Sequence, residues 1–155
     1  MPNSWPLAFT FMMLSQLSSS ISMKNLGLLI PAFSKATFSE PNAATVASTA
    51  EALSARRDVI VVNDVQGALT FSSMARKDSA LAKALTTVFI VAENAEALRE
   101  RLESRGEDTP EVIAERLAVA EAEMVQQGKF DHVVVSGTRE ADARALQGIY
   151  MIAKS

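Results

Sequence analysis

The chain has 155 residues, of which 48% are hydrophobic, and a formal net charge of -3 at pH 7. This length can bury one substantial core without a second domain, and the mixed charges form no basic field that would attract nucleic acid. The absence of cysteine excludes disulfides and Cys-ligated zinc, and the single histidine, His132, excludes a poly-His site, so no metal ligands are predicted.

Residues 1–39 differ in composition from the remainder of the chain. They hold eight serines and the two lysines Lys24 and Lys35, but no acidic residue. The apolar run Trp5–Leu14 is shorter than the roughly 20 residues that cross a bilayer, so no transmembrane span is expected. We interpret residues 1–39 as a Ser-rich apolar leader, either transit-like or disordered, and residues 40–155 as one folded domain.

Short β-branched runs alternate with longer segments of helical period from Ala43 onward. This alternation predicts an α/β fold in which helices join the strands of a parallel sheet. A first helix is expected over Ala43–Arg57. Three continuous apolar runs predict buried strands; they are Val59–Val62, Val88–Val91 and Val133–Val135.

The first helix of a predicted helical hairpin begins after Asn94, which is a favourable N-cap, and ends at Gly106. Arg101 borders its apolar stripe, and Arg105 lies at its C-terminal end, where the helix dipole favours a cation. The residues of the buried stripe are Ala95, Leu98 and Leu102.

The second helix of the hairpin is predicted to begin after Thr109 as N-cap, with Pro110 at its first position, and to stop near Gly128. Counting 100° per residue places Arg116 about 60° from the apolar stripe, so it borders the core. The stripe consists of Ile113, Leu117, Ala120 and Met124.

The turn of this hairpin collects Arg101, Arg105 and Arg116, and two interpretations stay open. The arginines could form a solvated face with local ion pairs. Alternatively, they could clamp phosphate, because a guanidinium donates two parallel hydrogen bonds to phosphate oxygens. The acidic neighbours available for ion pairs are Glu103, Glu107 and Glu115.

The segment Arg101–Glu123, R-L-E-S-R-G-E-D-T-P-E-V-I-A-E-R-L-A-V-A-E-A-E, resembles the lid signature of guanylate kinases, R-L-x-x-R-G-x-[DE] followed by R-L-x-x-A-x-x-E. Asp58–Ala68, which contains D-V-Q-G, and Phe130–Val135, which contains the last strand, match further family segments in the same order. The resemblance extends over Asp58–Ser155.

The resemblance implies part of a P-loop nucleoside monophosphate kinase fold and transfer of the γ-phosphoryl group of ATP to GMP, with Mg²⁺ accompanying ATP. It implies that Arg105 and Arg116, with Arg101 as a weaker third match, approach the nucleotide phosphates. Asp64 of D-V-Q-G would help to hold GMP at a strand end, which is where open α/β sheets bind ligands. The alternative role for Asp64 is that of a helix N-cap.

The chain departs from the family at the phosphate-binding loop. Guanylate kinases begin with G-x-x-G-x-G-K-[ST], whose backbone N–H groups and Lys hold the ATP phosphates, and this string does not occur here. The nearest segment, Leu28–Thr37 with Lys35 in the lysine position, contains no glycine. The family's GMP-binding segment, with its T-R-x-x-R run, paired tyrosines and Y-G-T turn, is also missing.

Three further departures concern the sheet. The strand before the phosphate loop normally lies inside the sheet, so we expect either that Leu26–Ile30 replaces it or that the sheet is incomplete. Val62 stands where the family has an acidic residue. Ser136 stands where the family has Asn after the last strand, which would shorten a nucleotide contact.

We therefore expect a guanylate-kinase-like protein that is catalytically deficient alone, and no catalytic residue is assigned. One alternative is a non-catalytic module that binds a nucleotide or an unidentified protein. Another is a truncated gene model of an active guanylate kinase. The family resemblance favours a cytoplasmic location, whereas a transit-like leader would direct the protein to a plastid or mitochondrion.

Overall fold

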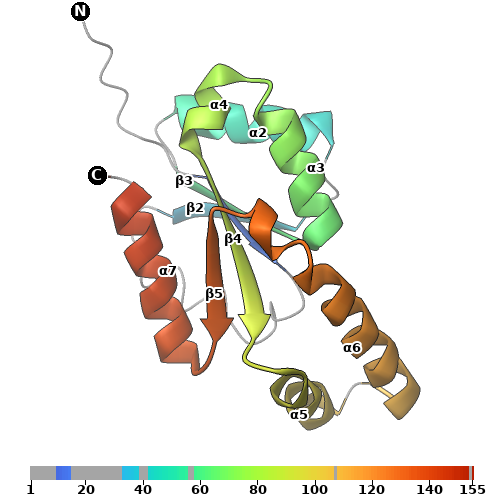
Figure 1. Ribbon diagram of the computed structural model, residues 1–155. Helices are drawn as coiled ribbons and strands as arrows, with labels where there is room; N and C mark the ends of the chain where they lie inside the picture. The colour runs from blue at the N-terminus through green and yellow to red at the C-terminus, as the bar shows by residue number, and fades with distance from the viewer. Residues whose placement is uncertain (1–9, 15–32, 39–41, 56–57, 107, 154) are drawn as a thin grey trace, which may run out of the picture.

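The computed structural model describes residues 10–14, 33–38, 42–55, 58–106, 108–153 and 155. Five parallel strands form one sheet with flanking helices (Figure 1), as the sequence predicts. The strands are β1 (Thr10–Leu14), β2 (Phe33–Phe38), β3 (Asp58–Asn63), β4 (Leu85–Ala92) and β5 (His132–Ser136). The helices are α2 (Ala43–Ser54), α3 (Val65–Ala75), α4 (Ser79–Ala84), α5 (Ala95–Arg105), α6 (Pro110–Met124), the short 3₁₀ helix η2 (Gln127–Lys129) and α7 (Arg139–Ala153).

The strand order is β2-β3-β1-β4-β5, so β1 lies at the centre of the sheet and pairs with both β3 and β4. This corrects the expectation that Leu26–Ile30 fills that place or that the sheet is incomplete. Leu26–Ile30 lies outside the described residues. Both β1 and β2 come from residues 1–39, so the start of the sheet does not coincide with the predicted boundary at residue 40.

The three predicted strands fall within β3, β4 and β5, but β5 is not buried throughout. Val134 lies in the core with Leu146 of α7, whereas Val133 and Val135 are 45% and 59% exposed. The prediction of a fully buried strand was wrong for these two valines. The reason is position, because β5 is an edge strand of the described sheet and has β4 as its one neighbour there.

Side chains from both faces of the sheet enter hydrophobic clusters. Neighbouring residues of a strand point to opposite faces, so Ile60 joins Leu102 of α5 and Leu146 of α7 in one cluster. Val61 joins Phe71 of α3 in the other. A large apolar side chain contributes about 1.5–3 kcal/mol when fully buried, and Phe71 is fully buried, so α3 is firmly held against the sheet.

The caps of the helical hairpin agree with the sequence. Asn94 accepts a hydrogen bond from the Ala97 amide at 2.8 Å, and Thr109 accepts one from Val112 at 3.4 Å. Gly106 follows α5 with a φ of 65°, a backbone conformation that glycine adopts without steric cost.

Three details of the hairpin differ from prediction. Ala95 is exposed, because it is the first residue of α5, and Met124 is 40% exposed, because it is the last residue of α6. The helix α6 ends at Met124 instead of near Gly128, which lies in η2.

Among the described residues, no helix has the length and apolar composition needed to cross a membrane.

A hydrogen bond between distant parts of the chain ties α7 to β3. The hydroxyl of Tyr150 donates to Oδ2 of the buried Asp58 at 2.7 Å. Burial and this bond raise the pKa of Tyr150 to about 12.

We predict that Tyr150→Phe lowers stability by about 1–3 kcal/mol near neutral pH, because Asp58 loses a buried partner. Ionised tyrosine is disfavoured in the folded state, so this contribution is complete below pH 10 and disappears as the pH rises towards 12. Urea denaturation of both proteins across this range measures it. Tyr150 is the sole tyrosine, so phenolate absorbance reports its ionisation directly; a midpoint near 10 would contradict the prediction.

A second prediction concerns Gly67 in the first turn of α3. A Cβ at this position would lie 2.9 Å from Asp64 Oδ1 and 3.1 Å from Asn63 Cβ. Gly67→Ala should therefore destabilise the protein by about 1–3 kcal/mol through overpacking. Gly148→Ala in α7 is the control, because its Cβ would meet no atom within 4 Å, and it should add about 0.5–1 kcal/mol. Equal changes in urea denaturation would contradict the role of close packing.

Candidate functional site

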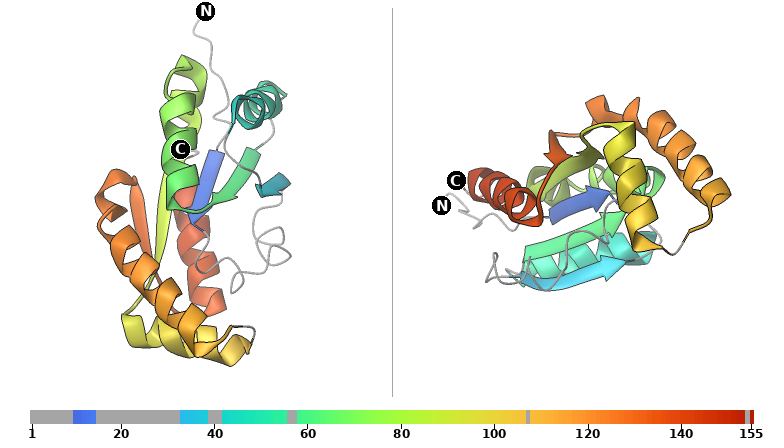
Figure 2. Two further views of the ribbon diagram at one scale, coloured as in Figure 1. Left: turned by 90° about the vertical axis from the view of Figure 1, so that its right-hand side faces the viewer. Right: turned by 90° about the horizontal axis from the view of Figure 1, so that it is seen from below.

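Parallel pairing places the carboxyl ends of all five strands at one edge of the sheet, which we call the carboxyl edge. Asp64 directly follows β3, and Ser136 is the last residue of β5. The helix α5 lies across the ends of β4 and β5, and α6 leads away from it (Figure 1 and Figure 2). The carboxyl edge therefore brings together several of the residues that the sequence singles out.

Asp64 is the N-cap of α3. Its Oδ1 accepts a hydrogen bond from the Gly67 amide at 2.6 Å, and its side chain is exposed at the carboxyl edge. The structure thus confirms the N-cap role that the sequence left as an alternative. A carboxylate has about four acceptor positions, so this bond leaves capacity for a ligand, and a nucleotide contact by Asp64 stays a prediction.

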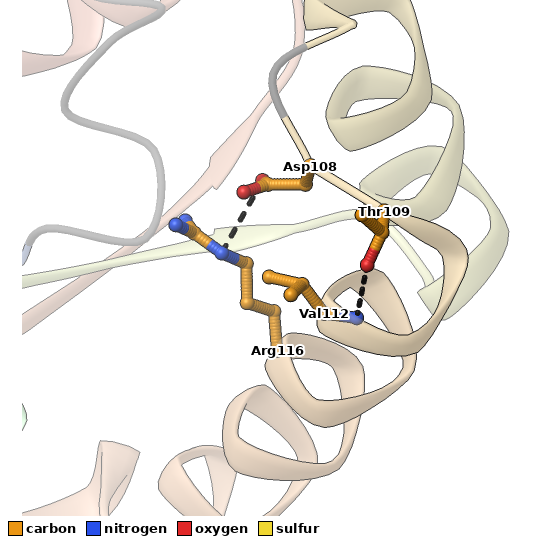
Figure 3. Close-up of polar contacts among 4 residues, drawn as sticks. All are labelled: Asp108, Thr109, Val112 and Arg116. Carbon is orange, nitrogen blue, oxygen red and sulfur yellow. Dashed lines mark hydrogen bonds and ion pairs between the residues drawn. The ribbon is translucent and has the colours of Figure 1, made fainter.

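Arg116 forms an ion pair with Asp108 at the start of α6 (Figure 3). Its Nε lies 3.3 Å from Asp108 Oδ2, and its side chain is 43% exposed. Asp108 also lies next to the N-cap Thr109, where the helix dipole favours a negative charge. Arg116 thus forms a local ion pair, as one of the two interpretations expected. Its partner is Asp108, however, and not one of the three glutamates that the sequence suggested.

Arg101 points to the end of β5. Its Nη1 donates to Ser136 Oγ at 2.9 Å, and its Nη2 donates to the carbonyl oxygens of Ser136 at 2.9 Å and Gly137 at 3.2 Å. Ser136 Oγ in turn donates a hydrogen bond to Asp142 Oδ2 at 2.5 Å, and the sequence did not predict this partner. Ser136 is 2% exposed and is already bonded on both sides.

Two other candidate residues contribute no described side chain. Arg105 is the last residue of α5, but its side chain lies outside the described part of the structure. Lys35 lies within β2 at an edge of the sheet, and its side chain is likewise outside that part. Because Phe33–Phe38 is a strand, the segment compared with the phosphate loop does not have the form of a loop there.

Within the described ranges, no three acidic or histidine side chains come close enough to hold a metal ion. The described residues therefore offer no site with three protein ligands for the Mg²⁺ that the resemblance implies. Magnesium commonly takes one or two carboxylates and completes its coordination with phosphate oxygens and water. Any Mg²⁺ here would be held mainly by the phosphates of a bound nucleotide and by water.

A groove of about 670 Å³ lies between α5, α6 and β4. Its lining is mainly apolar and includes Phe89, Val91, Leu98, Leu117 and Met124. The groove does not include Asp64, Arg101 or Arg116 in its lining. These three predicted nucleotide residues therefore lie outside the apolar groove.

Most of the chain is similar to known proteins of one family. A family model described as guanylate kinase matches residues 21–151. The chain belongs to the guanylate kinase family. The guanylate kinase of Nitrosomonas europaea is 35% identical over 99 residues, and that of Gloeobacter violaceus is 40% identical over 97 residues. The match covers 64% and 63% of this chain, but only 46% and 44% of those two proteins, so the chain spans less than half of their length.

Solved structures show the same guanylate kinase fold. The guanylate kinase of Anaplasma phagocytophilum is similar with a TM-score of 0.62 and 16% identity, covering 96% of this chain and 87% of that one. The SH3-kinase fragment of tight junction protein 3 is similar with a TM-score of 0.61 and 14% identity, covering 99% of this chain and 60% of that one. At these identities the likeness concerns the fold alone.

We predict that Asp64→Ala lowers the free energy of unfolding by about 1 kcal/mol, because α3 loses its N-cap. Asp64→Asn should change it by only a few tenths, since asparagine caps as well as aspartate does. Urea denaturation of both variants measures the difference. Equal losses in the two variants would show that the charge of Asp64, and not its cap, stabilises the fold.

Proposed function

We propose that this member of the guanylate kinase family binds a GMP-type nucleotide at the carboxyl edge and does not phosphorylate it on its own. One observation supports both parts. The chain keeps the lid arginines and the strand-end Asp64, but its sequence contains no G-x-x-G-x-G-K-[ST] segment. The whole reaction, ATP and GMP giving ADP and GDP, therefore belongs to the family. This chain retains the lid arginines and Asp64 as candidate nucleotide contacts, without the family's T-R-x-x-R and Y-G-T segment.

The binding part of the proposal rests first on Arg116. Its ion pair with Asp108 is partly exposed, and pairs of this kind contribute only about 0–1 kcal/mol. A phosphate group carries more charge and accepts two parallel hydrogen bonds from one guanidinium. Arg116 would therefore exchange Asp108 for a nucleotide phosphate at little cost, and Arg105 would supply a second cation from the end of α5.

Asp64 supports the same proposal from the other side of the edge. Its carboxylate is exposed beside the end of β3 and already oriented by the bond to Gly67. An oriented acceptor loses little conformational freedom when it binds a ligand. Asp64 would accept hydrogen bonds from the nucleotide while it continues to cap α3.

The absence of turnover follows from what phosphoryl transfer requires. Most of its catalysis comes from positioning the phosphates and from electrostatic stabilisation by backbone amides, lysine and Mg²⁺. Lid arginines alone cannot replace these groups, because they do not align the triphosphate with the attacking oxygen.

Titration calorimetry with GMP, GDP and ATP tests the proposal. GMP should bind the wild-type protein with a micromolar Kd, and Arg116→Ala should weaken binding about tenfold. Asp108→Asn should tighten it, because the competing carboxylate is removed. Arg144→Ala in α7 is the matched control and should leave the Kd unchanged. A coupled assay of ADP release with GMP and ATP should show no turnover above that of Arg116→Ala.

The outcomes separate the alternatives. ADP release that depends on GMP and is lost in Arg116→Ala would contradict the catalytic deficiency. Absence of binding by GMP, GDP and ATP would contradict the nucleotide site and favour a protein-binding module. Binding that is equally strong in Arg116→Ala would remove Arg116 from the proposed site.

A further inference from the structure

Three elements meet in a chain of hydrogen bonds at the end of β5. Arg101 of α5 donates three bonds to Ser136 and Gly137, and Ser136 Oγ donates to Asp142 Oδ2 of α7. The second oxygen of Asp142 accepts the Gly137 amide at 2.8 Å. The chain thus runs from a cation through a hydroxyl to a carboxylate, and we call it the β5 bridge.

The β5 bridge is not a loose surface contact. Ser136 and Asp142 are each 2% exposed, so their polar atoms depend on these partners. Leaving such groups without hydrogen bonds is costly in a buried environment. Asp142 lies in the first turn of α7, where the helix dipole also favours its charge. The geometry at the end of β5 is therefore well determined.

The bridge also attaches α5 to the end of β5. Leu98 and Leu102 hold the apolar side of α5 in the core, and Arg101 adds a polar attachment next to Leu102. Three bonds from one planar guanidinium fix both the distance and the direction of approach. From α5 the chain continues through Gly106 into α6, which carries Arg116.

We propose that Arg101 is a positioning residue, which holds the α5–α6 hairpin over the carboxyl edge through the β5 bridge instead of contacting the phosphate itself. The proposal rests on the proposed binding of GMP. It assigns the two arginines different roles, with Arg116 as the phosphate ligand and Arg101 as the residue that places Arg116.

Calorimetry with GMP on substituted proteins distinguishes the roles. Arg101→Ala should raise the Kd about tenfold, and Arg101→Lys should raise it by a similar factor, because an ammonium group cannot reach the three acceptors with the same geometry. Arg99→Ala, at an exposed arginine of the same helix, is the control and should bind like the wild type. The salt dependence of the Kd should stay at its wild-type slope in Arg101→Ala and become shallower in Arg116→Ala, since only the latter loses a charge contact with phosphate.

Recovery of wild-type affinity by Arg101→Lys, or a shallower salt dependence in Arg101→Ala, would overturn the proposal by showing a direct charge contact. An unchanged Kd in Arg101→Ala would overturn it as well. If Arg101→Ala does not fold, Arg101→Gln, which keeps most of the stem, takes its place in the same comparison.

Hydrogen exchange tests the positioning role without any nucleotide. Amides of α5 and α6 should exchange faster in Arg101→Ala than in the wild type, while those of α2 keep their rates. Unchanged exchange in α5 and α6 would overturn the inference. If the wild type binds no GMP, the proposed function fails, and the exchange rates still decide whether Arg101 holds the hairpin.

Discussion

Parallel pairing of the strands is the constraint on which the other features of the molecule depend. It requires each strand to start from the same side of the sheet, so each connection must return to that side, and helices lie in the described connections from β2 to β5. The same geometry gathers all strand ends at one edge. Asp64 and Ser136 are distant in sequence, yet both lie at that edge because each follows or ends a strand of the same direction.

Features encoded over a few residues could be predicted from the sequence. The caps Asn94 and Thr109 could be recognised because a capping side chain bonds an amide within three residues. The same signal, an aspartate before an apolar segment, was available for α3 and α4, whose N-caps are Asp64 and Asp78. The start of α4 was missed because no apolar stripe of several turns follows Asp78.

Features that depend on tertiary position could not be predicted. The strand Thr10–Leu14 holds four consecutive apolar residues without alternation, and so short an apolar run is equally compatible with a leader and with a central strand. Val133 and Val135 resemble buried strand residues, but their exposure follows from the edge position of β5. The partners of Arg101 come from another part of the chain, so helical spacing could show only that it borders the core.

Membership in the guanylate kinase family and possession of kinase chemistry are separate properties of this chain. The fold recurs in the enzyme from Anaplasma phagocytophilum and in the SH3-kinase fragment of tight junction protein 3. A fold provides the strand ends and the helices around them, and activity depends on which side chains those elements present.

Tyr150 provides a means to follow this scaffold, because it is the only phenol in the chain and joins α7 to Asp58. Any event that lifts α7 from β3 breaks the bond of this phenol to Asp58, so its ultraviolet spectrum is an intrinsic optical reporter of helix docking.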